Sequence, residues 1–252
     1  MQSVLLFSLI GYMAMKSFVL RNIVIPRVWL GTSPFIGAGQ FGERAEEYYK
    51  RFYLNPDNML AIMERAAELG WGIQSFIRPN LVSTIRTLKQ THPQVPCFFV
   101  CGMDTLSPEI ETALFLEPLV LGFHASIADH SSRAERQQCL ESVHNPHILT
   151  AFATHEPART LPVLQRTSVD LLMVPLNKSG RLMGKNAHIV PESVRTCKKP
   201  IIAKKVFCAG TIDCEFALEY VVSLGVSGVC LGVTSLEELE KNHETLQNLD
   251  FI

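Results

Sequence analysis

The sequence predicts a single closed (β/α)8 barrel of the TIM-barrel type, preceded by a short N-terminal hairpin. The first observation is a repeated unit, in which a short apolar segment alternates with an amphipathic segment of helical length. The second is that the strand centres are apolar on both faces, as in parallel sheets covered by helices. The third is length, because 252 residues accommodate eight such units in one domain. An open doubly wound sheet is the alternative, since patterning does not reveal closure.

The expected elements follow one another without a linker or a low-complexity segment. A hairpin is expected at 17–25, with Arg21 and Asn22 at its turn. The expected strands are 27–30, 71–76, 95–101, 119–124, 148–154, 169–176, 201–206 and 229–231. The expected helices are 55–69, 80–90, 108–115, 131–143, 158–166, 191–198, 214–224 and 236–246.

Local signals mark the first of these helices and the two least regular stretches. Asn55 is the expected N-cap, Pro56 the first helical residue, and Gly70 the residue after the last turn. The stretches 35–54 and 177–189 are expected to be loops that follow strands, where binding loops and lids occur in barrels.

Residues 1–15 are expected to lie outside the barrel domain, which we place at 16–252. The run 4–15 is apolar, but it has no basic start or clear cleavage site and is too short to span a bilayer. A true translation start at Met13 or Met15 would explain it. A signal or anchor segment is the alternative.

The amino-acid composition limits the classes of binding partner that we expect. The formal charge is −1, from 23 basic and 24 acidic residues, so no bulk positive field favours nucleic acid or a membrane surface. A small molecule, which could be anionic, is the expected partner. The seven cysteines include no CxxC pair, which argues against a structural zinc site and is typical of reduced thiols in a cytoplasmic protein.

The candidate catalytic residues lie where strands end, because the active site of such a barrel is at the carboxyl ends of its strands. They are His124, His155 and Lys204. His124 ends an apolar strand, and an imidazole there could act as an acid, a base, a hydrogen-bond donor or a metal ligand. A partly buried histidine with satisfied hydrogen bonds is the alternative. His155 precedes Glu156, which could simply cap the next helix.

Two lysines follow an apolar run in the segment 199–210, KPIIAKKVFCAG. Side chains alternate along a strand, so Lys204 and Lys205 are expected on opposite faces, one of them inside the barrel. A desolvated lysine could form a Schiff base. It could instead remain charged and hold a phosphate or carboxylate, or simply reach solvent.

A metal site is a weaker alternative. His124, Asp129, His155 and Glu156 carry suitable ligand atoms, but their spacing matches no specific signature, so no metal ligands are predicted.

The last helix offers a candidate cofactor site. Ser235 is its expected N-cap, with Glu238 completing a capping box. Backbone amides at this helix start could bind a phosphate, so Gly232, Thr234 and Ser235 are the candidate cofactor-binding residues.

Both ends of the chain resemble the aldo/keto reductase superfamily. The segment 24–37, VIPRVWLGTSPFIG, resembles that family's opening hairpin and first strand, and 217–242 resembles its closing helix, strand and helix. The middle is similar in the order of its units and in VDLL at 169–172. The resemblance implies a (β/α)8 barrel, an NAD(P) cofactor and carbonyl reduction, with His124 at the position of the family's catalytic histidine.

Other family positions differ. The second strand lacks the catalytic aspartate and tyrosine, and the third lacks the lysine. Met173 replaces a glutamine of the cofactor site, Lys204 replaces the aromatic residue that stacks on nicotinamide, and 234–240 is acidic where the family carries basic residues.

Three functions are therefore open from the sequence. The first is an NAD(P)-linked oxidoreductase acting on a small carbonyl compound. The second is a non-redox lyase or isomerase that uses Lys204 with His124 and His155. The third is a catalytically inactive barrel that binds a ligand.

Overall fold

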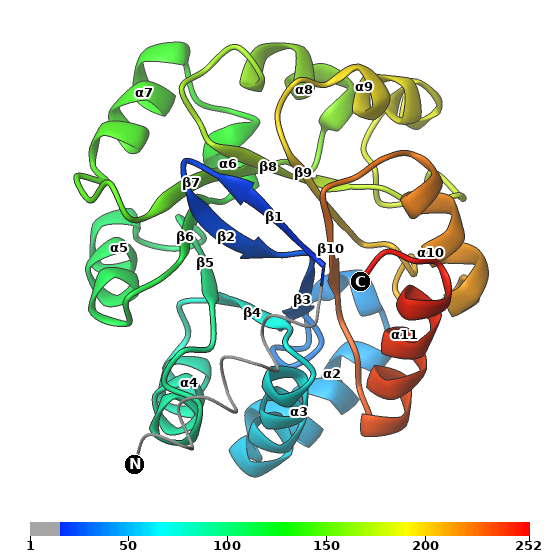
Figure 1. Cartoon of the computed structure of the whole chain (residues 1–252). Helices are drawn as coiled ribbons and strands as arrows, with labels where there is room; N and C mark the ends of the chain where they lie inside the picture. Colours follow the sequence, from blue (N-terminus) through cyan, green and yellow to red (C-terminus); the bar gives the residue numbers. More distant parts are fainter. Residues whose placement is uncertain (1–15) are drawn as a thin grey trace.

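The computed structural model describes residues 16–252 and contains a closed barrel of eight parallel strands (Figure 1). The first barrel strand, β3, pairs with the last, β10, through Val28 and Val229. The predicted (β/α)8 barrel is therefore confirmed, and the open-sheet alternative is wrong. The strands are β3 (Val28–Gly31), β4 (Gly72–Phe76), β5 (Cys97–Cys101), β6 (Val120–Phe123), β7 (Leu149–Ala153), β8 (Leu171–Pro175), β9 (Ile201–Lys204) and β10 (Gly228–Leu231).

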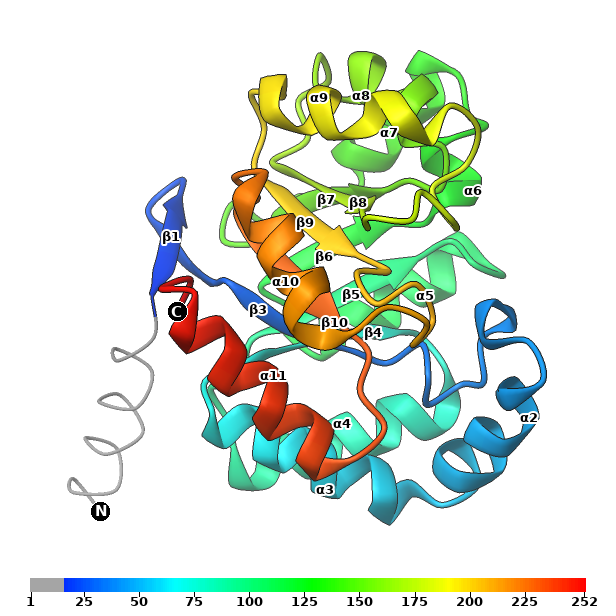
Figure 2. The same cartoon turned by 90° about the vertical axis from the view of Figure 1, so that its right-hand side faces the viewer.

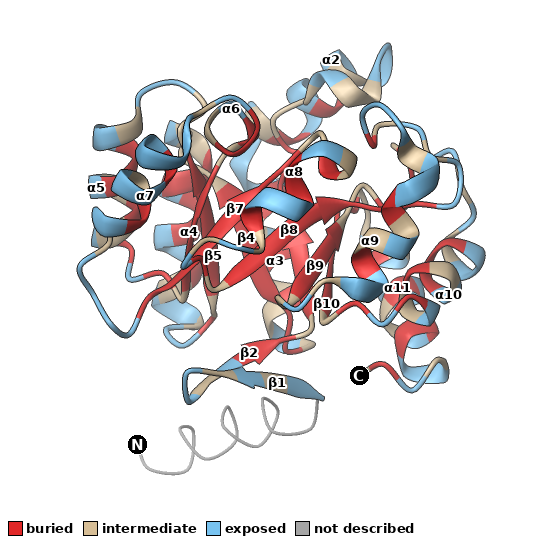
Figure 3. Ribbon diagram, turned by 90° about the horizontal axis from the view of Figure 1, so that it is seen from above, coloured by how far each residue is buried: buried red, intermediate tan, exposed pale blue. Residues whose placement is uncertain are grey.

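Helices surround the barrel, with buried residues toward the strands and exposed residues outward (Figure 3). A proline occupies the first turn of α3, α4, α8 and α9, where its missing N–H costs no helical hydrogen bond. The helices that follow the strands are α3 (Pro56–Glu68), α4 (Pro79–Thr91), α5 (Leu106–Phe115), α6 (Ala125–Ala128), α7 (Arg133–Glu141), α8 (Pro157–Leu164), α9 (Val190–Thr196), α10 (Cys214–Ser223) and α11 (Leu236–Asn248). None of the helices within 16–252 combines the length and apolar character needed to cross a bilayer.

The barrel interior is filled by large aromatic side chains that need glycine as a neighbour. Trp29 and Phe98 meet edge to face, with ring centroids 5.6 Å apart. A Cβ atom on Gly72 would lie 2.5 Å from the Trp29 ring, and one on Gly122 would lie 2.6 Å from the Phe98 ring. These two glycines therefore make the interior wide enough for both rings.

The segment after β3 is more regular than expected. It contains η1 (Gly39–Phe41), the short helix α2 (Arg44–Tyr48) and the π-helical turn η2 (Tyr49–Tyr53). Phe52 is buried and packs against Phe35 with ring centroids 4.9 Å apart, so aromatic packing orders this segment. The other long connection, 177–189, contains only the turn η3 (Ala187–Ile189).

Two predicted helices differ from the structure in detail. Asn55 is the N-cap of α3 and Pro56 its first residue, as predicted, but the Asn55 side chain makes no cap, and its Nδ2 atom donates to the Lys50 carbonyl at 2.6 Å. The predicted helix 131–143 is α7, which is shorter, and its N-cap Ser132 forms a full capping box with Glu135. The four-residue helix α6 precedes it and was not predicted.

The predicted N-terminal hairpin is present and closes the amino end of the barrel. It consists of β1 (Ser17–Leu20) and β2 (Ile23–Pro26), and both turn residues have positive φ, 53° at Arg21 and 64° at Asn22. Such angles belong to the type I′ turns favoured in tight hairpins. Ile25 packs into the interior cluster of the barrel. Figure 2 shows the hairpin at one end of the barrel and α2 at the other.

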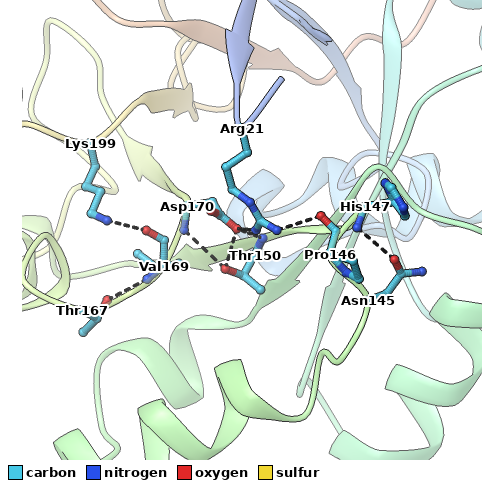
Figure 4. A network of polar contacts seen from close by, with 9 residues as sticks. All are labelled: Arg21, Asn145, Pro146, His147, Thr150, Thr167, Val169, Asp170 and Lys199. Atoms are coloured by element: carbon cyan, nitrogen blue, oxygen red, sulfur yellow. Dashed lines mark hydrogen bonds and ion pairs between the residues drawn. The ribbon is translucent and has the colours of Figure 1, made fainter. Parts of the chain in front are cut away.

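A polar network attaches the hairpin turn to the barrel (Figure 4). The guanidinium of Arg21 donates to Asp170 Oδ2 at 3.0 Å and to the Pro146 carbonyl at 2.7 Å. Asp170 Oδ2 also accepts from the Thr150 backbone N–H at 2.8 Å and from its hydroxyl at 3.0 Å. One mostly buried carboxylate thus accepts hydrogen bonds from both the hairpin turn and β7.

We expect Asp170→Ala to lower the free energy of unfolding by about 1–3 kcal/mol, because it leaves the Thr150 N–H without an acceptor in a poorly solvated position. Urea unfolding at constant pH measures the change. Asp250→Ala is the control, since it breaks the ion pair with Lys16 at a fully exposed carboxylate and should cost clearly less. Equal effects of the two substitutions would contradict the role assigned to Asp170.

Candidate active site

A cavity of about 470 Å³ opens at the carboxyl ends of the barrel strands. Its wall includes Gln74 of β4, Met173 of β8, Lys204 of β9 and Cys230 of β10. The segments after β3 and β9 form its mouth. This is the size and the place at which barrel enzymes bind small molecules.

The three residues predicted as catalytic meet in this cavity. His124, His155 and Lys204 all line it. The two imidazole rings contact each other edge to face, with centroids 5.4 Å apart and planes at 89°. The structure thus brings the three side chains together, while their catalytic roles stay a prediction.

The start of its own helix favours one tautomer of His124. It is the N-cap of α6, and its Nδ1 atom lies 3.2 Å from both the backbone N–H and the hydroxyl of Ser126. The backbone N–H can only donate, so its contact favours the neutral ring with the proton on Nε2. Burial, followed by the charge of Lys204, lowers the pKa of His124 to about 4. The neutral ring can therefore donate a hydrogen bond from Nε2 to a ligand at neutral pH.

His155 is positioned through its backbone by a buried carboxylate. Its N–H donates to Asp129 Oδ2 at 2.8 Å, and the hydroxyl of Thr154 donates to Asp129 Oδ1 at 2.5 Å. Burial, followed by the charges of Lys204 and Lys205, lowers the pKa of His155 to about 2. Burial is the largest cause for both rings, and it lowers both pKa values independently of the charge on Lys204.

Lys204 ends β9, and protein atoms surround its ammonium group although the residue keeps some exposure to the cavity. Burial, followed by the charge of Lys205, lowers the pKa of Lys204 to about 7. The charge of Asp129 acts in the opposite direction. A large share of this lysine is therefore a neutral amine at physiological pH, which is the nucleophilic form.

The expectation that Lys204 and Lys205 lie on opposite faces of the sheet is wrong. The strand ends at Lys204, and Lys205 has a φ of 57°, in the left-handed region, so the alternation of an extended strand does not reach it. Both lysines line the cavity. Burial also lowers the pKa of Lys205.

The cavity wall also contains an unpaired amide. The side chain of Gln74 is 3% exposed, and its Nε2 atom has no hydrogen-bond partner among the described residues. Its Oε1 atom faces the thiol of Cys230 at 3.5 Å. Burial raises the pKa of that thiol to about 12, so it remains protonated. The Gln74 Nε2 atom is therefore a buried donor without a partner among the described residues, and it is not itself open to the cavity.

The proposed phosphate site at α11 is taken by the protein's own carboxylate. Ser235 is the N-cap as predicted and accepts from the Glu238 N–H at 3.1 Å. Glu238 does not return to Ser235; its Oε2 accepts from the N–H of Thr234 at 2.6 Å and from the hydroxyl at 3.0 Å. An NAD(P) phosphate at Thr234 would compete with this negative charge for the same amide, so these residues do not fit that group as arranged.

Gly232 has a packing role. A Cβ atom there would lie 2.9 Å from Pro34 Cγ, so glycine allows β10 and the segment after β3 to meet. This contact accounts for Gly232 without a cofactor.

The acids of the weaker metal hypothesis have other partners. The oxygens of Asp129 bind Thr154 and His155, and Glu156 Oε2 accepts from the Lys185 N–H at 3.2 Å. Across 16–252, no three His, Cys, Asp or Glu side chains lie close enough together to hold a metal ion.

Sequence reasoning did not identify Arg44, which lines the mouth of the cavity from α2. Its guanidinium donates to the Ala209 carbonyl on the segment after β9 and lies 5.8 Å from the Tyr48 ring centroid. The spacing of Tyr48 and Phe52, one helical turn apart, was the available signal that this stretch is helical.

No protein-family model and no curated protein matches the chain. Solved structures do match. A Pseudomonas aeruginosa protein provisionally classed as an aldo-keto reductase has a TM-score of 0.66 at 17% identity, covering 92% of this chain and 94% of its own. An aldo-keto reductase from Bacillus halodurans has a TM-score of 0.61 at 12% identity, covering 92% and 90%.

A barrel of another class is also similar. Thiamine phosphate pyrophosphorylase from Pyrococcus furiosus has a TM-score of 0.52 at 16% identity, covering 78% of this chain and 90% of its own. At such identities the likeness establishes the barrel fold, and a fold of this kind supports many reactions.

We expect the free energy of unfolding to fall as pH drops below about 6.5, because the unfolded chain then binds protons that neutral His124 and His155 do not. His155→Gln removes the difference in proton binding at residue 155 between the folded and unfolded chain. The loss of stability between pH 6.5 and 5 should therefore be smaller by up to about 1.5 kcal/mol in this variant. Urea titrations at several pH values measure it, with His124→Gln as a parallel test. A pH dependence identical to that of the unsubstituted protein in both variants would show that these rings are not held neutral.

Proposed function

We propose that this chain is a barrel enzyme that acts on small carbonyl compounds by forming an imine with Lys204. The observation that carries the proposal is the position of Lys204. Its amine lies at the end of β9, in a cavity lined also by His124 and His155, and its pKa is lowered to about 7. A solvent-exposed lysine with a pKa near 10.4 would be neutral in fewer than about one molecule in a thousand at pH 7.

The chemistry follows from these groups. The neutral Nζ atom attacks the carbonyl carbon, a C–N bond forms, and the π electron pair moves to the oxygen. The Nε2–H of His124 is the donor available to that oxygen. After proton transfer from nitrogen to oxygen, a further proton from solvent lets the hydroxyl leave as water. The sum is amine, carbonyl and one proton giving an iminium ion and water.

An iminium ion withdraws electrons from the neighbouring carbon. It would therefore promote cleavage or rearrangement of an adjacent C–H or C–C bond, as in lyases and isomerases that use lysine. The neutral imidazole of His155 is the group available to receive a proton in such a step. Its lowered pKa makes it a weak base, so we assign it to proton relay.

An NAD(P)-linked oxidoreductase is the second candidate. It is supported by the similarity to aldo-keto reductase structures and by the sequence resemblance at both ends of the chain. Against it stand the Glu238 carboxylate at Thr234 and Lys204 at the position of the stacking aromatic residue. Titration with reduced nicotinamide cofactors, followed by their fluorescence, tests this candidate, and saturable binding would support it.

We further propose a cytoplasmic location and a small-molecule partner. All seven cysteines are free thiols in the structure, which suits a reducing compartment.

We expect borohydride to trap a covalent adduct on Lys204 when the protein is incubated with small aldehydes, ketones or keto acids. Mass spectrometry of peptides locates the adduct. Trapping should increase between pH 6 and 8, because the neutral fraction of an amine with a pKa of about 7 rises over that range. Lys204→Met should abolish it, whereas Lys198→Met, at an exposed site near the amino end of β9, should not.

An unmodified Lys204 across the whole panel would sink the imine proposal. If neither imine formation nor cofactor binding occurs, the remaining function is that of a ligand-binding barrel without catalysis.

A further inference from the structure

Positive charge dominates the titratable groups of the cavity. Its wall contains Arg44, Lys204 and Lys205, against a single carboxylate, Glu238. None of these three side chains takes part in the ion pairs found within 16–252. A small site in which Arg44 and Lys205 have no ion-pair partner, and in which Lys204 is charged in part of the molecules, favours an anionic ligand.

The nearby carboxylates already have partners. Glu238 accepts two hydrogen bonds from Thr234. Asp129 accepts from Thr154 and from the His155 N–H, so its oxygens face the protein rather than the lysines, although its charge still acts on both. Burial of a cation without a direct partner is costly, and a ligand anion would offset that cost.

Lys205 is held in place by its backbone. Its left-handed conformation is maintained by two bonds to its carbonyl, from the Cys208 N–H at 3.0 Å and from Asn177 Nδ2 at 3.2 Å. Asn177 is 2% exposed. A non-glycine residue in this region of φ is strained, so the surrounding bonds impose a conformation that extended backbone would not give.

Arg44 lines the mouth of the same cavity from α2, in the segment that follows β3. Its bond to the Ala209 carbonyl joins α2 to the segment that follows Lys205. A Cβ atom on Gly210 would lie 3.3 Å from Arg44 Nη2, so glycine there leaves room for the guanidinium.

From these observations we propose that the cavity selects carbonyl compounds that carry an anionic oxygen group, a carboxylate or a phosphate, and that Lys205 and Arg44 hold this group. The proposal rests on the proposed function for the carbonyl end of the ligand, where Lys204 reacts. The anion itself is bound by noncovalent contacts and can be tested without any reaction.

The test compares matched anionic and neutral ligands by thermal stabilisation, which reports binding to the folded protein. One arm uses pyruvate and methyl pyruvate, and the other uses dihydroxyacetone phosphate and dihydroxyacetone. Inorganic phosphate serves as a ligand without a carbonyl. The anionic member of at least one pair is expected to bind about tenfold more tightly than the neutral member, because it gains charge-assisted hydrogen bonds.

Lys205→Asn is the informative variant, since asparagine tolerates the left-handed conformation and removes the charge. It should lose most of the preference for the anion, as should Arg44→Gln. Lys205→Arg should retain it, and Lys198→Asn, an exposed lysine remote from the cavity, should behave like the unsubstituted protein.

The outcomes separate the two proposals. Equal binding of anionic and neutral ligands, or a preference that survives both Lys205→Asn and Arg44→Gln, overturns the anion site even if borohydride traps Lys204. Anion binding that these variants remove supports the site even if no imine forms. The arm that shows the preference distinguishes carboxylate from phosphate.

Discussion

The desolvation of Lys204 at the end of β9 is the interaction on which the candidate site depends. A strand of Ile201, Ile202 and Ala203 delivers this amine to the open end of the barrel, where burial opposes its positive charge. The same environment keeps His124 and His155 neutral. The charge of Asp129 opposes this lowering, but its oxygens bind Thr154 and His155, and burial has the larger effect. The arrangement therefore favours an amine over an ammonium and a hydrogen-bonding imidazole over an acidic one.

The shared fold and the contents of the cavity are separate matters. The similarity to aldo-keto reductase structures, at 17% identity or less, establishes the barrel fold. The cavity contains Lys204, and Glu238 accepts from the Thr234 N–H at the start of α11. His124 accepts the Ser126 N–H on Nδ1, which favours a proton on Nε2. A barrel can keep its architecture while its open end acquires another reaction.

Most of the fold could be predicted from the sequence, because strand and helix patterns are local and eight repeats leave few arrangements. The meeting of His124, His155 and Lys204 followed from one rule, that strand ends share an edge. What could not be predicted depends on contacts between distant segments. The left-handed turn at Lys205 is stabilised by Asn177, and the orientation of Arg44 depends on the Ala209 carbonyl. Neither bond has a signature in local sequence.

The contact between Lys16 and Asp250 brings the two ends of the described chain together beside the hairpin. Every residue that lines the cavity lies between Gly31 and Glu238, so the site does not use this junction. The cavity therefore does not depend on where the described chain begins and ends. A circular permutant that joins these ends and opens at an exposed connection on the helical rim would keep the cavity walls intact. In this barrel, chain ends can thus be moved to another exposed connection without placing them next to the cavity.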